Sequence, residues 1–88
     1  MRISQEKQKK IIEQILLFLY SVFPKQPFTA EIAREIARDE EFIKNLLFEM
    51  KKQGLIIFIR KNNKGEIFSR RIKWRLANKI YNIYNSKQ

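Results

Sequence analysis

The sequence predicts a small α+β domain in which four helices accompany one β-hairpin. Apolar residues recur every three or four positions in the first 50 residues and again near the C-terminus, which is the spacing of amphipathic helices. Between these stretches, residues 55–59 are a run of leucine, isoleucine and phenylalanine that is typical of a strand. An apolar fraction of 44%, which includes 12% aromatic residues, is enough for a packed core despite the net charge of +10. We therefore expect residues 1–88 to fold as one domain.

The first predicted helix covers residues 4–23, with Ser4 as the expected N-cap. Apolar residues recur along it at helical spacing from Ile11 onwards. In its second half, Phe18 and Tyr20 extend the apolar surface nearly round the helix, which is more than one face of a small domain buries. A second element, or a second chain, is therefore expected to cover this end of the helix.

The second predicted helix covers residues 29–38. Pro24 and Pro27 end the first helix and hold the connection in extended or turn conformations. Thr29 lies two residues after Pro27 and is the expected N-cap of the second helix. Isoleucine and alanine residues then form an apolar stripe at helical spacing, so this short helix is expected to pack closely on its neighbours.

The third predicted helix covers residues 39–53 and follows the second after a tight turn. Asp39 is the expected N-cap, and Glu40 and Glu41 lie in the first turn, where the helix macrodipole favours negative charge. Two lysines and then Gly54 mark the C-terminal end.

Residues 55–76 form the predicted hairpin, and residues 78–86 form a last short helix. Residues 62–65 tolerate positive φ and supply the turn, although two turn centres one residue apart leave the register open. Alternation places Trp74 on the apolar face of the returning strand, which favours a core anchor over a base-stacking platform. Phe58 lies on a strand that is apolar on both faces, so it either stacks bases or packs under the first helix.

The order helix, helix, turn, helix, basic hairpin and helix resembles a winged helix-turn-helix domain. Residues 29–37 look like the positioning helix of this family, residues 53–56 are similar to its approach to the wing, and residues 71–76 resemble the return strand of the wing. The resemblance extends to MarR-like small transcriptional regulators of prokaryotes, archaea or their viruses. It implies a three-helix core, a two-stranded wing and a C-terminal helix, with residues 39–53 as the recognition helix.

The excess positive charge lies entirely in the C-terminal part of the chain. Residues 1–50 carry eight Lys or Arg and eight Asp or Glu, whereas residues 51–88 carry eleven Lys or Arg against the single acid Glu66. Such a concentration suits a polyanion, because each Lys or Arg that pairs with a phosphate releases counterions. The alternative is a solvated strand face in a lysine-rich protein. The nucleic-acid contacts expected on the wing are Lys61, Lys64, Arg70, Arg71, Lys73 and Arg75.

The recognition helix has few basic residues to offer a nucleic acid. The resemblance implies that its N-terminal half enters the major groove, with Lys44 and Asn45 as the expected contacts. Glu40 and Glu41 in the same half are repelled by phosphates and are more typical of a helix start than of base reading. This favours a mode of nucleic-acid binding in which the wing makes most of the contacts.

Two arginines of the second helix are further candidate phosphate contacts. The resemblance implies that Arg34 and Arg38 hold phosphates across the groove. The same residues are spaced to form helix-surface ion pairs with Glu31 and Glu35. The sequence does not decide between the two roles.

The apolar residues of the first and last helices predict a homodimer built from terminal helices, as is frequent in the family that the chain resembles. A two-fold dimer of this kind places two wings on successive half-sites of a duplex. The alternative is that the two helices cover each other within one protomer. The residues expected in the dimer interface are Leu16, Phe18, Leu19, Tyr20, Phe23, Ile80, Ile83 and Tyr84.

Residue types that are absent exclude several classes of function. Without Cys or His there is no disulfide, no thiolate or imidazole metal ligand and no Ser-His pair, so no enzyme, metal or other cofactor is predicted. The longest apolar stretch, residues 15–23, is shorter than the roughly 20 residues that span a bilayer. We expect a cytoplasmic protein that contacts no membrane and has no small-molecule ligand.

The sequence therefore favours a small transcriptional regulator that binds duplex DNA with some sequence preference. Two alternatives remain open. An RNA- or ribosome-associated winged helix would dock its basic hairpin on RNA shape and 2′-hydroxyl groups. A protein-docking winged helix would use the neutral N-terminal half and leave the basic wing incidental.

Overall fold

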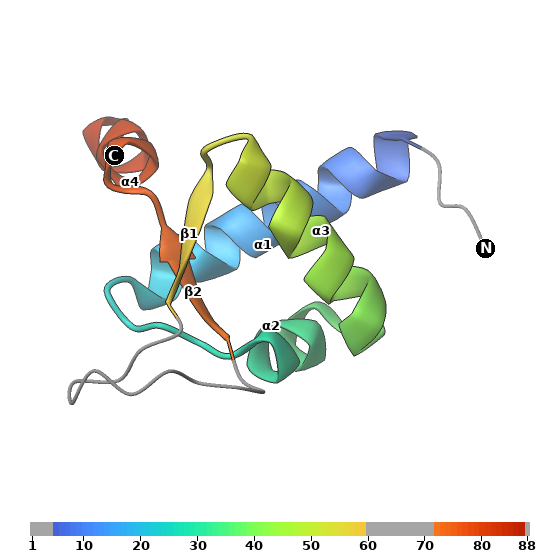
Figure 1. The fold of residues 1–88 in the computed structure, drawn as a ribbon. Helices are drawn as coiled ribbons and strands as arrows, with labels where there is room; N and C mark the ends of the chain where they lie inside the picture. Colours follow the sequence, from blue (N-terminus) through green and yellow to red (C-terminus); the bar gives the residue numbers. More distant parts are fainter. Residues whose placement is uncertain (1–4, 60–71, 88) are drawn as a thin grey trace, which may run out of the picture.

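The computed structural model describes residues 5–59 and 72–87, in which four helices pack around an antiparallel pair of strands (Figure 1). This arrangement confirms the predicted α+β class. None of the helices in this part of the chain is long and apolar enough to span a membrane. The elements in chain order are α1 (Gln5–Val22), α2 (Thr29–Ile36), α3 (Glu40–Lys52), β1 (Ile56–Ile59), β2 (Lys73–Leu76) and α4 (Asn78–Ser86). The predicted N-cap Ser4 and the predicted turn at residues 62–65 lie outside the described residues.

The hydrophobic core lies where the first three helices meet the two strands. Trp74 of β2 has no exposed surface, which confirms its prediction as a core anchor. Phe48 of α3 packs edge-on to it, with 5.3 Å between the ring centroids. The other fully buried large side chains are Ile15, Leu19, Ile32, Ile43, Leu47, Met50, Ile56 and Leu76.

Phe58 of β1 packs against aromatic side chains of α3 and β2. Its ring centroid lies 6.0 Å from that of Trp74 and 6.3 Å from that of Phe48. The side chain therefore packs between α3 and the strands, rather than under α1. The Lys51 Nζ lies over the outer side of the ring, 4.5 Å from its centroid.

The strand register, which the sequence left open, follows from the pairing of β1 with β2. The two strands are antiparallel, and Ile56 lies opposite Leu76 while Ile59 lies opposite Lys73. Side chains alternate between the two faces of the sheet along β2. The buried Trp74 and Leu76 therefore share the core face, and Lys73 and Arg75 lie on the opposite face.

A short extended segment before α2 pairs with the other edge of β2, which the sequence analysis missed. Phe28 and Lys73 form an antiparallel bridge. The Trp74 backbone N–H donates to the Pro27 carbonyl over 3.0 Å, and the Thr29 N–H donates to the Ile72 carbonyl over 3.3 Å. The strand β2 is therefore central, and it connects β1 to the start of α2.

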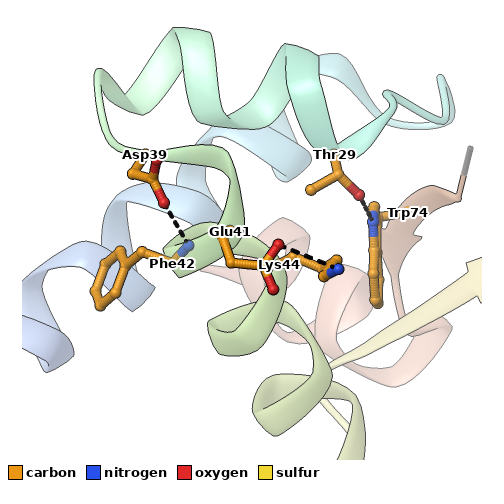
Figure 2. Close-up of polar contacts among 6 residues, drawn as sticks. All are labelled: Thr29, Asp39, Glu41, Phe42, Lys44 and Trp74. Carbon is orange, nitrogen blue, oxygen red and sulfur yellow. Dashed lines mark hydrogen bonds and ion pairs between the residues drawn. The ribbon is translucent and has the colours of Figure 1, made fainter.

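The predicted N-cap role of Thr29 is wrong. Thr29 is the first residue of α2, and its buried hydroxyl accepts a hydrogen bond of 2.8 Å from the Trp74 indole N–H (Figure 2). Phe28 occupies the cap position instead, and its backbone N–H donates to the Glu31 carboxylate over 3.0 Å. The Thr29 hydroxyl thus accepts from a residue distant in sequence and does not cap its own helix.

The second helix ends two residues earlier than predicted, at Ile36. Ala37 adopts the left-handed conformation, with φ 62° and ψ 45°. Its N–H and that of Arg38 donate to the carbonyls of Arg34 and Ala33, which satisfies the last turn of the helix. Glycine usually takes this position, so an alanine here gave no stop signal in the sequence.

The third helix begins with the predicted cap. The Asp39 carboxylate accepts a hydrogen bond of 3.1 Å from the Phe42 backbone N–H (Figure 2), and Glu40 and Glu41 occupy the first turn. At the other end, Lys51 and Lys52 form the last turn. Both ends of α3 thus carry the charges that the helix macrodipole favours.

The last helix packs on the C-terminal end of α1 through aromatic side chains. Phe23 stacks on Tyr81 with 3.9 Å between ring centroids. Tyr20 lies 5.5 Å from Tyr81 and 5.6 Å from Tyr84, and its hydroxyl donates to the Asn85 side-chain carbonyl over 3.4 Å. The two terminal helices therefore cover part of each other's apolar surface within one protomer.

Candidate nucleic-acid interface

An open groove of about 680 Å³ lies between the start of α2, the start of α3 and the residue that precedes β2. It lies where the extended segment before α2 is held against β2 and where α2 packs on α3. Its walls combine one aromatic and two aliphatic side chains with polar and charged ones. The lining residues are Phe28, Thr29, Ala30, Glu31, Arg34, Glu40, Lys44 and Ile72.

Two cations and two carboxylates face this groove. Arg34 is exposed on α2 and Lys44 is half-exposed on α3, and they lie on different walls. Glu31 is held at the start of α2 by its contact with the Phe28 backbone, while Glu40 lies in the first turn of α3. Among the described residues that line the groove, Arg34 and Lys44 are therefore the ones that offer a phosphate positive charge.

The sequence left open whether Arg34 and Arg38 pair with glutamates of the same helix. In the part of the chain that the structure describes, neither guanidinium lies within ion-pair distance of Glu31 or Glu35. Both arginines are exposed. This geometry favours their availability to an external anion.

The exposed side of α3 brings the two predicted base contacts together. Lys44 and Asn45 lie side by side, one half-exposed and the other exposed. The Lys44 Nζ lies 3.3 Å from a carboxylate oxygen of Glu41 one turn earlier (Figure 2), and these side chains are 41% and 70% exposed. Such an exposed pair is weak, so an approaching phosphate competes for the lysine at low cost.

The two predicted wing contacts that the structure describes have local partners. The Lys73 Nζ lies 5.3 Å from the centroid of the Phe28 ring, near the groove. The Arg75 Nη1 donates to the Leu76 carbonyl over 3.1 Å and to the Asn78 side-chain carbonyl over 2.9 Å. Arg75 therefore connects β2 to the start of α4. The predicted contacts Lys61, Lys64, Arg70 and Arg71 lie outside the described residues.

The contact between Thr29 and Trp74 sets how the groove's walls meet, and sequence reasoning missed it. It joins the first residue of α2 to the middle of β2, and Phe48 packs on the same indole from α3. All three elements that line the groove are thus fixed to one buried ring. The sequence carried a partial signal, since a tryptophan in a buried strand needs an acceptor for its N–H.

Only part of the predicted dimer interface is exposed. Leu16 and Leu19 are buried within the protomer, with 8% and 1% of their surface exposed, so their assignment to an interface is wrong. Their helical phase places them on the core side of α1. The remaining predicted residues are half-buried, apart from Ile83, which is 49% exposed. They are Phe18, Tyr20, Phe23, Ile80 and Tyr84.

A further exposed apolar residue, Leu17, was not singled out from the sequence. It is 56% exposed and lies in a shallow depression of about 590 Å³ between α1 and the end of α2. The depression also contains Phe18, Val22 and Ile36. Leu17 and Ile83 are the large apolar side chains of the described residues that lie open to solvent.

Among the described residues, the last acidic side chain along the chain is Glu49 in α3. Beyond Glu49, every charged side chain in residues 50–59 and 72–87 is basic. The last two residues of α3, strand β2 and the segment from α4 onwards therefore contribute a positive field with no acidic residue of their own. The residues concerned are Lys51, Lys52, Lys73, Arg75, Lys79 and Lys87.

No family model and no curated protein matches this sequence. Solved structures do resemble the fold. An apo variant of ZitR from Lactococcus lactis aligns with a TM-score of 0.69 at 22% identity, over 93% of this chain and 57% of that one. ZitR is a zinc-responsive MarR family member.

Two structures of MepR from S. aureus are similar to this chain as well. One is in a DNA-binding conformation, with a TM-score of 0.67 and 19% identity over 96% of this chain and 55% of that one. The other is a variant bound to an oligodeoxyribonucleotide, with a TM-score of 0.64 and 20% identity over 94% and 66%. This chain therefore spans only about half to two thirds of the length of these proteins. At these identities the likeness confirms the winged helix-turn-helix fold.

Proposed function

We propose that this chain binds duplex DNA and acts as a small transcriptional regulator in the cytoplasm. The observation that carries the proposal is the groove between α2, α3 and the residue before β2, which Arg34 and Lys44 both line on a winged-helix fold. The positive charge at the end of α3, on β2 and on α4 supports it, because such charge attracts the phosphate backbone of DNA, whereas an acidic surface would repel it. That MepR of similar fold has been solved with an oligodeoxyribonucleotide supports it further.

In the proposed complex, α3 lies in the major groove and the wing lies along the backbone. Asn45 is suited to a bidentate contact with adenine, and Lys44 to guanine or to a phosphate. Arg34 and Arg38 contact phosphates from α2. Lys73 and Arg75 extend the phosphate contacts along the wing, together with Lys61, Lys64, Arg70 and Arg71.

The acidic first turn of α3 limits how the helix reads DNA. Glu40 and Glu41 carry charges of the same sign as the phosphates, and Glu41 also holds Lys44 in an ion pair. Few direct base contacts are then available, so the sequence preference of the protein is modest. The proposed complex requires no cofactor and catalyses no reaction.

The proposed regulator is a homodimer with a two-fold axis. Leu17 on α1 and Ile83 on α4 are large apolar side chains that one protomer leaves exposed, and burial of both by a second copy would remove them from water. Phe18 and Tyr84 lie at the margins of the same surfaces. A dimer of this kind predicts a palindromic or pseudopalindromic DNA site.

Fluorescence anisotropy against random-sequence duplex DNA and a structured RNA, at several salt concentrations, tests the proposal. We expect duplex DNA to bind more tightly, with a log-log salt slope of about −4 to −6, which corresponds to roughly five phosphates. The double variant Arg34→Gln with Lys44→Gln is expected to make this slope shallower by about two. The matched control Lys9→Gln with Lys10→Gln removes the same charge from the exposed side of α1 and should leave it unchanged.

Other outcomes of this experiment have a definite meaning. Tighter binding of the RNA would replace the proposal with an RNA-associated winged helix. If neither polymer binds at low salt, the groove is not a nucleic-acid interface, and the exposed surface of α1 is the place to search for a protein partner. Equal slopes for the groove variant and the control would remove Arg34 and Lys44 from the interface.

A further inference from the structure

A second group of basic side chains surrounds the C-terminal end of α3, away from the groove. Lys51 and Lys52 form the last turn of that helix, and Lys79 lies in the first turn of α4. We call Lys51, Lys52 and Lys79 the corner surface. Figure 1 shows α4 beside the loop that follows α3, at the opposite end of that helix from α2.

Backbone contacts hold the two parts of the corner surface together. The Ala77 N–H donates to the Leu55 carbonyl over 3.0 Å, which joins the residue before α4 to the residue before β1. The Lys79 Nζ reaches across to the end of α3, where it lies 3.7 Å from the position that a Cβ on Gly54 would occupy. Lys79, which is distant in sequence from Lys51 and Lys52, thus lies at the same end of the molecule as they do.

The macrodipole of α3 accounts for part of this charge and leaves a surplus. The C-terminal end of a helix carries roughly half a negative charge, which favours one nearby cation. Glu49 is the one carboxylate close to the corner surface among the described residues, at 3.9 Å from the Lys52 Nζ. A surplus of like charges repels itself unless an anion is bound.

The corner surface is too far from the groove to contact the same phosphate. Lys44 and Lys52 are eight residues apart in α3, which at about 1.5 Å per residue separates them by roughly 12 Å along the helix axis. Lys44 lines the groove near the first end, and Lys52 lies at the second. The two surfaces therefore meet different segments of a polyanion.

We propose that the corner surface binds the phosphate backbone of a second DNA duplex, so that the protein bridges two duplexes. The inference rests on the proposed function, because the groove and the wing hold the first duplex. The chemistry at the corner suits a backbone and not bases, since lysines on flexible stems act as point charges. The second contact is therefore independent of DNA sequence and strongly dependent on salt.

A capture assay tests the bridge. A duplex is immobilised on beads and saturated with the full chain, and retention of a second, fluorescent duplex is measured at several salt concentrations. The wild-type protein should retain the second duplex at low salt. The variant Lys52→Gln with Lys79→Gln should retain several-fold less, with a salt slope for retention that is shallower by about two. Lys51 is left in place because it packs over Phe58.

Three controls separate the bridge from other effects. The variant Lys9→Gln with Lys10→Gln has the same net charge and should retain the second duplex like the wild type. The variant Lys52→Arg with Lys79→Arg keeps both charges and should also retain it. Anisotropy with one free duplex should give affinities within about twofold for all of these proteins, because charge at the corner does not touch the groove.

Each remaining result decides one of the two proposals. If no protein binds the immobilised duplex, the proposed function itself fails. If the immobilised duplex binds protein but retains no second duplex, or if the corner variant and its α1 control retain it equally, the corner surface is not a DNA site and its lysines serve only the end of α3.

Discussion

The two ends of α3 carry charges of opposite sign, and each end obeys the same rule of helix stability. Asp39, Glu40 and Glu41 lie at the start, whereas Lys51 and Lys52 lie at the end, in agreement with the helix macrodipole. For a protein that binds DNA, these charges have different consequences. At the basic end, helix stability and attraction to phosphate act together, whereas at the acidic end they oppose each other.

This difference explains why the groove, and not α3 alone, is the candidate interface. At the acidic end, attraction to phosphates is left to Arg34 from another helix and to Lys44 one turn further on. The aromatic contacts around Trp74 fix those elements relative to one another. Substitutions that loosen the contacts around Trp74 should affect the whole groove, whereas substitutions of single charges should affect one end of α3 at a time.

The largest effect on stability is expected from Thr29→Val, which loosens the contacts around Trp74. The substitution removes the acceptor of the Trp74 indole N–H, a group that is fully buried. Leaving such a donor unsatisfied lowers the free energy of unfolding by about 1–3 kcal/mol. Urea denaturation followed by tryptophan fluorescence measures the change. Thr29→Ser keeps the hydroxyl and should retain most of the stability, whereas a loss in Thr29→Ser with none in Thr29→Val would show that the methyl group matters and the hydrogen bond does not.

The next effect concerns the acidic end directly. Asp39→Ala removes the side chain that accepts from the Phe42 N–H, and loss of such a cap costs about 1 kcal/mol. The variant Asp39→Asn keeps an acceptor without the charge. If the cap acts through its hydrogen bond, the free energy of unfolding of Asp39→Asn stays close to the wild type, whereas an equal loss in both variants would assign the effect to charge.

The elements of the fold could be predicted from the sequence because each has a local signal. The period of apolar residues gives α1 and α3, and Asp39 marks a helix start by residue type alone. The features that escaped prediction depend on partners far along the chain. The Thr29 hydroxyl is used by Trp74, 45 positions later, so a rule based on neighbouring residues assigned it to a cap. The bridge between Phe28 and Lys73 is likewise a single pair with no repeating pattern.

The candidate site was predicted less completely than the fold, for a related reason. Charge and residue type identified Arg34, Lys44 and Asn45 as candidates, but not which of them share a groove. That arrangement depends on how α2 and α3 cross, which no periodicity encodes. Likewise, Leu16 and Leu17 are both apolar and adjacent, and only the direction of the core determines that one is buried and the other exposed.

A smaller change of stability, with both charged ends untouched, is expected from Ala37→Gly. Ala37 holds a left-handed conformation that costs a residue with a Cβ about 1 kcal/mol more than glycine. The loss of backbone freedom in the glycine variant offsets part of this gain, so the free energy of unfolding should rise by a few tenths to about 1 kcal/mol. Thermal unfolding measures it, and DNA affinity should not change. A fall in stability would show that Ala37 contributes packing that outweighs its conformation.

The smallest change of free energy, and the sharpest test of the comparison, is expected from Glu41→Gln. The substitution removes a favourable first-turn charge and an exposed ion pair, so the protein should lose only about 0.5 kcal/mol of stability. Its affinity for duplex DNA should rise by about two- to fivefold at low salt, because Lys44 is released and one charge that repels phosphates is gone. The control Glu6→Gln makes the same change in the first turn of α1. If the two variants gain affinity equally, the effect is one of net charge, and the acidic end of α3 has no special part in DNA binding. A gain confined to Glu41→Gln means that helix stability and DNA binding place opposite demands on this residue.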